Sequence, residues 1–383
     1  MTSSERVQAA FEHRETDKVP VHHIGFSSEI ASALLGREAY VGGGIQQWRE
    51  AVALWKGKEA HEEFLERSFR DAIEIALLCD HDMIRPSYWR YNVQPTKRID
   101  EYTFLYAYGE EEHWRVLRYD PPSEQCHIFP YKPTARMTLE DLERDIASRE
   151  KTVESDPLTE ETFAFEIRAQ HLLGKERAVR IGGVGVGVPV RDAEVWFEAF
   201  LLRPDLVARH LDIQVKQAVR NVAFLVPFGF RYFFGGLDLA SNEGPMYSPR
   251  LFQELVVPRL QRVSEACHQQ GAYHLFASDG NLWPVAEELF GGSGVDGYYE
   301  IDRRAGMDLR TLRERFPRLT LLGNISSHTV HLGTKEEVVA EVLSCLEEAR
   351  RGKGIIVGTS NYFVPGTPVE NVIALLETIR AYR

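Results

Sequence analysis

The segment YHLFASDGN, residues 273–281, begins as a hydrophobic strand and ends in four polar or small residues. Tyr273 to Ala277 form a short apolar run of the length that buried strands have. Seven further runs have a similar β-rich composition, and several of them also end in glycine or a small polar residue. They are VPVHHI (19–24), DMIRPS (82–87), AVRIGG (178–183), RYFFGG (231–236), DGYYEI (296–301), LTLLGN (319–324) and GIIVGT (354–359).

Long helical patterns separate most of these runs. The segment 248–270 begins with Ser-Pro, and its Pro258 predicts a kink or a split into two helices. The segment 334–353 has a capping-box pattern, with Thr334 followed three residues later by Glu337. Eight strands that alternate with helices predict an α/β protein with a (β/α)8 TIM barrel.

A doubly wound sheet is the alternative fold. It usually carries a GxGxxG motif after its first strand, but the glycine-rich stretch GGVGVGVP (182–189) lacks that spacing and ends in a proline. No GxxxxGK[ST] motif is present either, so nucleotide binding has weak support. Residues 92–176 do not follow the barrel rhythm. We interpret the chain as one domain, 1–383, in which 92–176 is an insertion after the second strand, a small β-hairpin followed by helices that covers part of the barrel mouth.

Composition narrows the classes of function. The net charge is −12, from 57 acidic and 45 basic residues, and no Lys/Arg-rich run favours a nucleic-acid surface. The four cysteines are scattered without a CxxC pair, which is typical of free thiols in a reducing compartment. No apolar stretch approaches the length of a membrane helix, and the first residues are polar. We expect a soluble cytoplasmic protein that acts on a small-molecule substrate, without nucleic-acid or membrane partners.

The active site of such a barrel forms at the carboxyl ends of its strands. Those positions are rich in acids and poor in cations: His22, His23, Asp82, Arg85, Asp238, Asn242, Glu243, Asp279, Glu300, Asp302, Asn324, Asn361 and Tyr362. In the opening segment, Tyr273, Leu275, Ala277 and Asp279 share one face of the strand. Periodicity does not say whether that face looks inward.

Several of these candidates have a structural alternative. Asp279-Gly280 is a common turn pair, so the carboxylate could either bond its own backbone or take part in chemistry. His22 and His23 are neighbours on a strand and point opposite ways, so we expect one packed and one exposed histidine instead of a metal pair. Cys79 and His81 have C-x-H spacing, but a zinc site needs three or four ligands, which favours a structural role.

Several motifs together resemble the uroporphyrinogen decarboxylase superfamily, which includes corrinoid-linked methyltransferases with the same barrel. The resemblance covers nearly the whole chain. It is carried by RVQAAFEHRETDKVPV (6–21), the strand, loop and helix of 235–263, ASDGNLWPVAEEL (277–289), 294–312, LLGNIS (321–326) and VPGTPVENV (364–372). In this order the motifs indicate the superfamily, though they do not identify a reaction.

The departures from the family pattern are informative. The decarboxylase has an arginine-rich loop after its first strand, whereas HHIGFSSE (22–29) has no arginine. A substrate with eight carboxylates needs cationic partners, which argues against uroporphyrinogen itself. The resemblance places the decarboxylase's catalytic aspartate at Asp82 and replaces its late histidine by Asn361. The zinc ligands of the thiol-directed methyltransferases fall on Ala277, Asp279 and Asn361, so a thiolate zinc site is not expected and no metal ligand is predicted.

The resemblance therefore implies a methyltransferase that moves a methyl group between a methylcorrinoid (cobalamin) on a carrier protein and a small acceptor such as tetrahydrofolate. Asp82, Asp238 and Asp279 are the predicted catalytic residues. The predicted substrate-binding residues are His22, His23, Asn242, Glu243, Glu300, Asn324, Asn361 and Tyr362. The alternative is a decarboxylase, a lyase in which Asp82 stabilises a protonated intermediate, and a non-catalytic binding barrel is a third hypothesis. A homodimer is implied by the resemblance alone.

Overall fold

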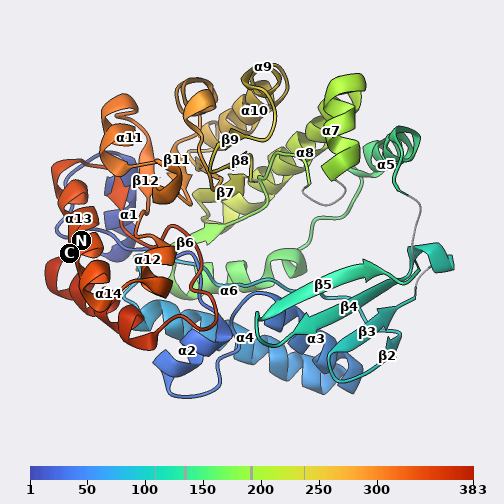
Figure 1. Cartoon of the computed structure of the whole chain (residues 1–383), viewed down its shortest axis with the longest axis horizontal. Coiled ribbons are helices and arrows are strands. Elements are labelled where there is room, and N and C mark those ends of the chain that lie inside the picture. Colours follow the sequence, from blue (N-terminus) through green and yellow to red (C-terminus); the bar gives the residue numbers. More distant parts are fainter. Residues whose placement is uncertain (108, 133–135, 190–192, 237) are drawn as a thin grey trace.

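Seven parallel strands form one curled sheet in a computed structural model that describes residues 1–107, 109–132, 136–189, 193–236 and 238–383 (Figure 1). The strand order is β1-β6-β7-β10-β11-β12-β13. Their bounds are Met83–Ile84, Ala178–Ile181, Tyr232–Gly236, Tyr273–Ala277, Gly297–Tyr299, Thr320–Leu322 and Ile355–Ile356. Each strand lies within a predicted run, so seven of the eight strands are confirmed. The order never reverses along the chain, which distinguishes this sheet from a doubly wound one.

The eighth predicted strand, 19–24, is irregular and makes only isolated contacts with the sheet. Val21 bridges Val357 in parallel next to β13, and its carbonyl accepts a hydrogen bond of 2.8 Å from the Asp82 N–H next to β1. Pro20 has no N–H to donate, which limits the ladder that this segment can form. The segment therefore lies between the two edge strands of the sheet without being a strand itself.

Helices follow most strands and pack on the outer face of the sheet (Figure 1). Helix α13 begins with the predicted capping box, in which the Glu337 N–H donates to Thr334 Oγ1 over 3.2 Å and the Thr334 N–H donates to Glu337 Oε2 over 2.7 Å. The helix bounds are α1 Ser3–Phe11, α2 Ser28–Leu35, α3 Gly44–Lys56, α4 Lys58–Leu78, α5 Leu139–Thr152, α6 Ala164–Leu173, α7 Ala193–Leu202, α8 Pro204–Leu225, α9 Pro249–Leu251, α10 Val257–His268, α11 Leu309–Arg315, α12 Ser327–Leu332, α13 Lys335–Arg351 and α14 Val369–Tyr382.

The predicted split of the helix at 248–270 is confirmed. A π-helical segment, Phe252–Val256, separates α9 from α10, and Pro258 lies in the first turn of α10. The missing proline N–H is tolerated at a helix start but not within a helix, so the break precedes Pro258. The described helices are all too short or too polar to cross a lipid bilayer.

Strand β10 shows which side of the sheet faces the interior of the curl. Leu275 and Ala277 belong to the apolar cluster that contains inward side chains from the other strands. Phe276 packs in the large cluster beneath the helices, and the His274 imidazole lies 2.9 Å from the Ser264 hydroxyl of α10. Since side chains alternate along a strand, Asp279 shares the inward face with Leu275 and Ala277.

The segment expected to be a small hairpin is a four-stranded antiparallel sheet. Its strands are β2 Lys97–Arg98, β3 Thr103–Tyr106, β4 Arg115–Asp120 and β5 Gln125–Pro130. Phe104, Tyr106 and Leu117 bury one face of it against Ala51 of α3. A separate hairpin, β8 Ala240–Ser241 and β9 Gly244–Pro245, follows β7 at the carboxyl edge of the main sheet.

Candidate active site

Asp279 is both a turn residue and a held carboxylate. Gly280 has φ 85°, and a Cβ there would lie 2.5 Å from the Ala240 carbonyl oxygen, so the turn requires glycine. The turn leaves the Asp279 side chain facing the interior, where the Asn361 Nδ2 donates a 2.7 Å hydrogen bond to its Oδ2. The Asn361 Oδ1 in turn accepts from the Tyr362 N–H over 2.7 Å. Asp279 can therefore be a turn residue and still present its carboxylate for chemistry, so the two interpretations from the sequence are compatible.

Asp238, Asp279 and Glu300 form a group that we call the carboxylate trio. One carboxylate oxygen from each lies within 4.8 Å of the others. Asp238 follows β7 and is exposed, while Asp279 and Glu300 are partly buried. Glu300 follows the inward-facing Tyr299 and would point outward from an extended strand, but its φ of 64° turns the backbone there. Positive φ is uncommon for a residue other than glycine and often marks functional sites.

Burial and the neighbouring negative charges hold protons on Asp279 and Glu300. Burial first, and then the charges of Glu300 and Asp238, raise the pKa of Asp279 to about 8. Burial and the charge of Asp238 raise the pKa of Glu300 to about 7, against the opposing effect of Arg180 and Arg85. Because Asp279 and Glu300 are close and cannot both ionise cheaply, they titrate together. At neutral pH these two groups can therefore both donate and accept a proton.

Two arginines lie beside the carboxylate trio, and the sequence analysis missed one of them. Arg180 projects from β6 over the Phe234 ring, 3.9 Å from its centroid, and its Nη1 lies 3.4 Å from His22 Nε2. His22 Nδ1 lies 2.9 Å from the Met83 carbonyl oxygen and must be its donor nitrogen, which leaves Nε2 to accept from Arg180. Arg180 alternates with the buried Ala178, a signal that could have found it. The site is therefore less poor in cations than the strand ends predict.

Arg85 follows β1 and also enters the site. Its Nη1 donates to the Ile24 carbonyl over 3.1 Å and its Nε to the Ser87 carbonyl over 2.9 Å. A Cβ on Gly25 would lie 2.9 Å from the Tyr362 ring and 3.3 Å from Arg85 Nη1. The backbone at Gly25 therefore approaches both side chains closely, which explains a glycine at this position.

His23 takes no part in the carboxylate trio. Its ring lies 5.1 Å from that of His81 and 5.5 Å from that of Phe363, and its Nδ1 accepts from the Thr359 N–H over 3.2 Å. His22 and His23 face opposite sides, as predicted, but both are buried, so the expectation of one exposed histidine is wrong. Both faces of this segment pack against other side chains, which explains why neither histidine is exposed.

Asp82 and three predicted binding residues also lie apart from the trio. Asp82 precedes β1, at the amino edge of the sheet, where it pairs with Arg6 and Arg383. Asn242 and Glu243 are exposed in the turn of the β8–β9 hairpin. Asn324 is buried, and its Nδ2 donates to the Met307 carbonyl over 3.0 Å. The structure thus brings together Asp238, Asp279, Glu300 and Asn361, with His22 and Tyr362 beside the neighbouring arginines.

The carboxylate trio is the only group of three metal-ligating side chains within the described ranges. Its donors are oxygens, which suit a hard cation such as Mg²⁺ or Ca²⁺. The trio contains neither a thiolate nor an imidazole, the ligands that zinc prefers. Cys79, Cys267 and Cys345 are buried elsewhere as free thiols, and burial raises the pKa of each, to about 12, 12 and 11.

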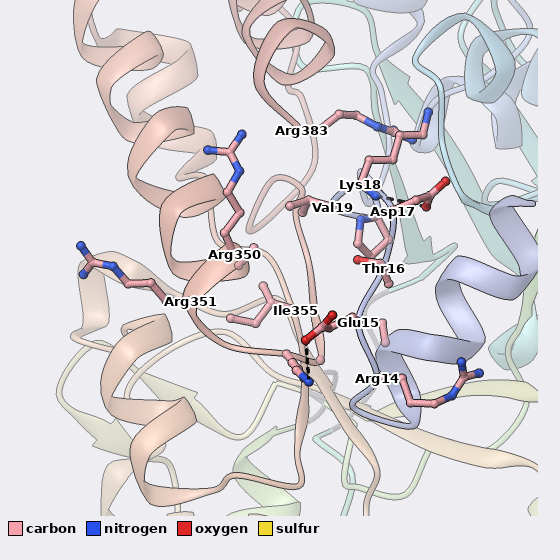
Figure 2. A pocket seen from close by; sticks show the side chains of 15 residues that line it. Arg14, Glu15, Thr16, Asp17, Lys18, Val19, Arg350, Arg351, Ile355 and Arg383 are labelled. Atoms are coloured by element: carbon pink, nitrogen blue, oxygen red, sulfur yellow. Dashed lines mark hydrogen bonds and ion pairs between the residues drawn. The ribbon is translucent and has the colours of Figure 1, made fainter. Parts of the chain in front are cut away.

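A hollow lies where α1, α13 and the chain end meet, and Figure 2 shows the charged side chains that line it. Arg14, Lys18, Arg350 and Arg351 make it basic in composition. Most of these charges are compensated by neighbours, such as Lys18 by Asp80 at 3.4 Å. The hollow also lies at the amino edge of the sheet, away from the edge where the barrel fold places its chemistry. It is therefore a weaker candidate than the carboxylate trio.

Comparisons with known proteins agree on a family. The family model described as uroporphyrinogen decarboxylase (URO-D) matches residues 186–382. A uroporphyrinogen decarboxylase of Anaeromyxobacter sp. (strain Fw109-5) is 31% identical over 156 residues, and one of Anaeromyxobacter dehalogenans (strain 2CP-C) is 30% identical over 130 residues. These matches cover 40% and 34% of this chain, and only 40% and 36% of the two relatives.

A solved structure supports the fold over the whole length. A methyltransferase from Methanosarcina mazei superposes with a TM-score of 0.64, covering 100% of this chain and 99% of its own, at 19% sequence identity. At that identity the likeness concerns the fold.

Proposed function

Because the chain belongs to the uroporphyrinogen decarboxylase family, we propose that it is an enzyme of that family with its active site at the carboxylate trio. The reaction we propose is the transfer of a methyl group between a methylcorrinoid on a carrier protein and a small acceptor such as tetrahydrofolate. We also propose that residues 19–24 close the sheet into an eight-stranded TIM barrel, which their contacts with both edge strands support.

The observation that carries this proposal is the carboxylate trio, in which Asp279 and Glu300 have raised pKa values. A methylcorrinoid supplies a methyl group that leaves without its bonding electron pair. When an acceptor nitrogen forms its bond to that methyl group, it must lose its own proton. An ionised member of the trio can accept this proton, and a protonated member can return it in the reverse direction. The pKa values near 7 and 8 keep both forms present at neutral pH.

Asn361 and Asp279 would position the acceptor. A pterin ring carries adjacent hydrogen-bond donors and acceptors, and carboxylate and amide side chains pair with such edges. The Asn361 amide already fixes the Asp279 carboxylate at 2.7 Å, so the proton-transfer group is held in place before the substrate arrives. The methyltransferase with the similar fold provides further support, within the limits of its 19% identity.

The test is a methyl-transfer assay with methylcobalamin and tetrahydrofolate, in which mass spectrometry detects methyltetrahydrofolate. We expect transfer by the wild-type protein and a loss of about 10²-fold or more in Asp279→Asn, because an amide cannot accept the proton. Arg350→Gln, an exposed substitution on α13, is the matched control and should keep wild-type activity. Wild-type protein that neither binds these substrates nor transfers a methyl group would refute the proposal.

Decarboxylation is the second candidate, favoured by the two curated relatives and by the arginines beside the trio. In this reaction a carbon–carbon bond breaks, carbon dioxide leaves, and protonated Asp279 gives its proton to the carbon that keeps the electron pair. Release of carbon dioxide from a smaller carboxylic acid, measured in the gas phase, separates this activity from methyl transfer. The single arginine pair makes a substrate with eight carboxylates a poor fit, so we expect no release from uroporphyrinogen.

A further inference from the structure

Arg85 and Arg180 carry positive charge into the interior of the sheet without a carboxylate partner. Within the described part of the chain, no aspartate or glutamate oxygen lies within ion-pair distance of either guanidinium, although most other arginines have such a partner. Both side chains are half-buried, and a charge that is partly withdrawn from water is costly when it has no counter-charge. An unpaired arginine in a candidate active site therefore points to a ligand that supplies the missing negative charge.

The surroundings of Arg180 increase the free-energy cost of leaving its charge unpaired. Its guanidinium lies over the adjacent rings of Phe234 and Tyr299, 3.9 and 5.4 Å from their centroids. Burial, together with the like charge of Arg85, lowers the pKa of Arg180 to about 10. The aromatic faces attract a cation but cannot neutralise it. The free protein thus keeps two like charges close together in a poorly solvated place.

Both guanidinium groups are held in fixed positions by contacts that use only part of their donors. Arg180 Nη1 donates to His22 Nε2, while Arg85 uses Nε and Nη1 on the Ser87 and Ile24 carbonyls. Arg180 also has a side-chain hydrogen bond with Tyr299. Among the described residues these contacts occupy only some of the five N–H donors of each guanidinium, which leaves others for a ligand. Free, oriented guanidinium N–H groups match the two oxygens of a carboxylate.

The arginines and the carboxylate trio belong to one site. Arg180 and Arg85 both lower the pKa of Glu300, which shows that their charges act on the trio. Tyr299, which contacts Arg180, directly precedes Glu300 in the chain. A small molecule whose carboxylate meets the arginines therefore places its remaining atoms against Asp279 and Glu300.

We propose that Arg85 and Arg180 form a carboxylate subsite and that the substrate is a carboxylic acid whose reacting atom lies beside the trio. This inference rests on the proposed function only in assigning chemistry to the trio. The carboxylate could belong to a small acid or to the glutamate tail of a folate. The two sources share the recognition chemistry and differ in length.

Calorimetric titration of the full chain tests the subsite with defined probes. Acetate stands for a small acid, p-aminobenzoylglutamate for the folate tail, and acetamide is the neutral control. We expect at least one carboxylate to bind 10-fold or more tightly than acetamide, and Arg180→Gln and Arg85→Gln to weaken that binding at least 10-fold. Arg350→Gln is the control and should bind like wild type. Tighter binding of acetate assigns a small acid, and tighter binding of p-aminobenzoylglutamate assigns a folate.

Further measurements keep failure of folding and failure of function separate. If Arg180→Gln does not fold, Arg180→Lys, which keeps the charge and loses the planar fork, should fold and bind the carboxylate more weakly. Carboxylate binding no tighter than that of acetamide, or unchanged in Arg180→Gln, would overturn the subsite. Carboxylate binding that needs Arg180 without any methyl transfer would overturn the proposed function alone. Methyl transfer with an unchanged KM in Arg180→Gln would overturn the subsite alone.

Discussion

Ionisation of Asp279 destabilises the folded protein, so the free energy of unfolding depends on pH. Its pKa is raised from 3.8 to about 8 on folding, chiefly by burial. The stability linked to its protonated form is complete below about pH 4 and is lost as the pH rises through 8. Asp279→Asn removes this loss, so we expect the variant to match wild type near pH 4 and to exceed it by about 1–3 kcal/mol at pH 9. Urea unfolding at both pH values measures the difference. A gap between the proteins that does not change with pH would contradict the assignment.

At the residue scale, sequence reasoning located the acids better than it predicted their directions. Asp238, Asp279 and Glu300 were all predicted from their places after strands, and the structure brings them together. From strand alternation alone, Glu300 would point away from Asp279. Its direction is instead decided by a backbone φ of 64°, which the residue pattern does not predict. Arg180 was overlooked because its strand reads as apolar, although its alternation with Ala178 carried the signal.

At the element scale, apolar runs predicted seven strands and Pro258 predicted a helix break, because both are local consequences of sequence. Two features were not local. The segment 19–24 has the composition of a strand, but its position between both sheet edges leaves it irregular. Residues 97–130 pair with their neighbours in a four-stranded meander, but one face of it packs on Ala51 of α3, which is distant in sequence. The sequence indicated only that these residues depart from the barrel rhythm.

The same segment, 19–24, should make the fold sensitive to acid. His22, His23 and His81 are buried together, and burial lowers the pKa of each, that of His23 to about 3. The stability linked to a neutral buried histidine is present above the unfolded pKa near 6.5 and is lost as the pH falls below it. Between pH 6.5 and 5 we expect a loss of about 2 kcal/mol from His23, and losses in the same direction from His22 and His81.

His23→Phe tests this expectation, since His23 already packs against Phe363. The variant should be slightly less stable at pH 7.5, because the Thr359 N–H loses its acceptor, but it should lose less free energy of unfolding on acidification than wild type. Urea unfolding at pH 7.5 and 5 provides the comparison. An equal acid loss in both proteins would assign the sensitivity to other groups.

At the scale of the whole molecule, the two chain ends meet at the amino edge of the sheet. Figure 1 shows the N and C labels side by side, and Arg6 of α1 and Arg383 both pair with the Asp82 carboxylate. Asp82 is fully buried and also accepts a hydrogen bond of 2.8 Å from the Val21 N–H. One carboxylate thus joins the first helix, the irregular segment, the first strand and the last residue.

This arrangement allows a structural role for Asp82 to be separated from the catalytic role that the family resemblance implies. A structural role predicts that Asp82→Asn lowers the free energy of unfolding by about 1.5–3 kcal/mol, because Arg6 and Arg383 each lose their buried partner and keep only the more exposed Asp17 and Asp80. Arg6→Met, which leaves Asp82 with Arg383, should also destabilise the protein. Activity per folded molecule should remain near wild type, since the trio lies at the opposite edge of the sheet. Urea unfolding and an activity assay corrected for the folded fraction distinguish the two roles. Normal stability of Asp82→Asn together with a loss of turnover would support a catalytic role for Asp82.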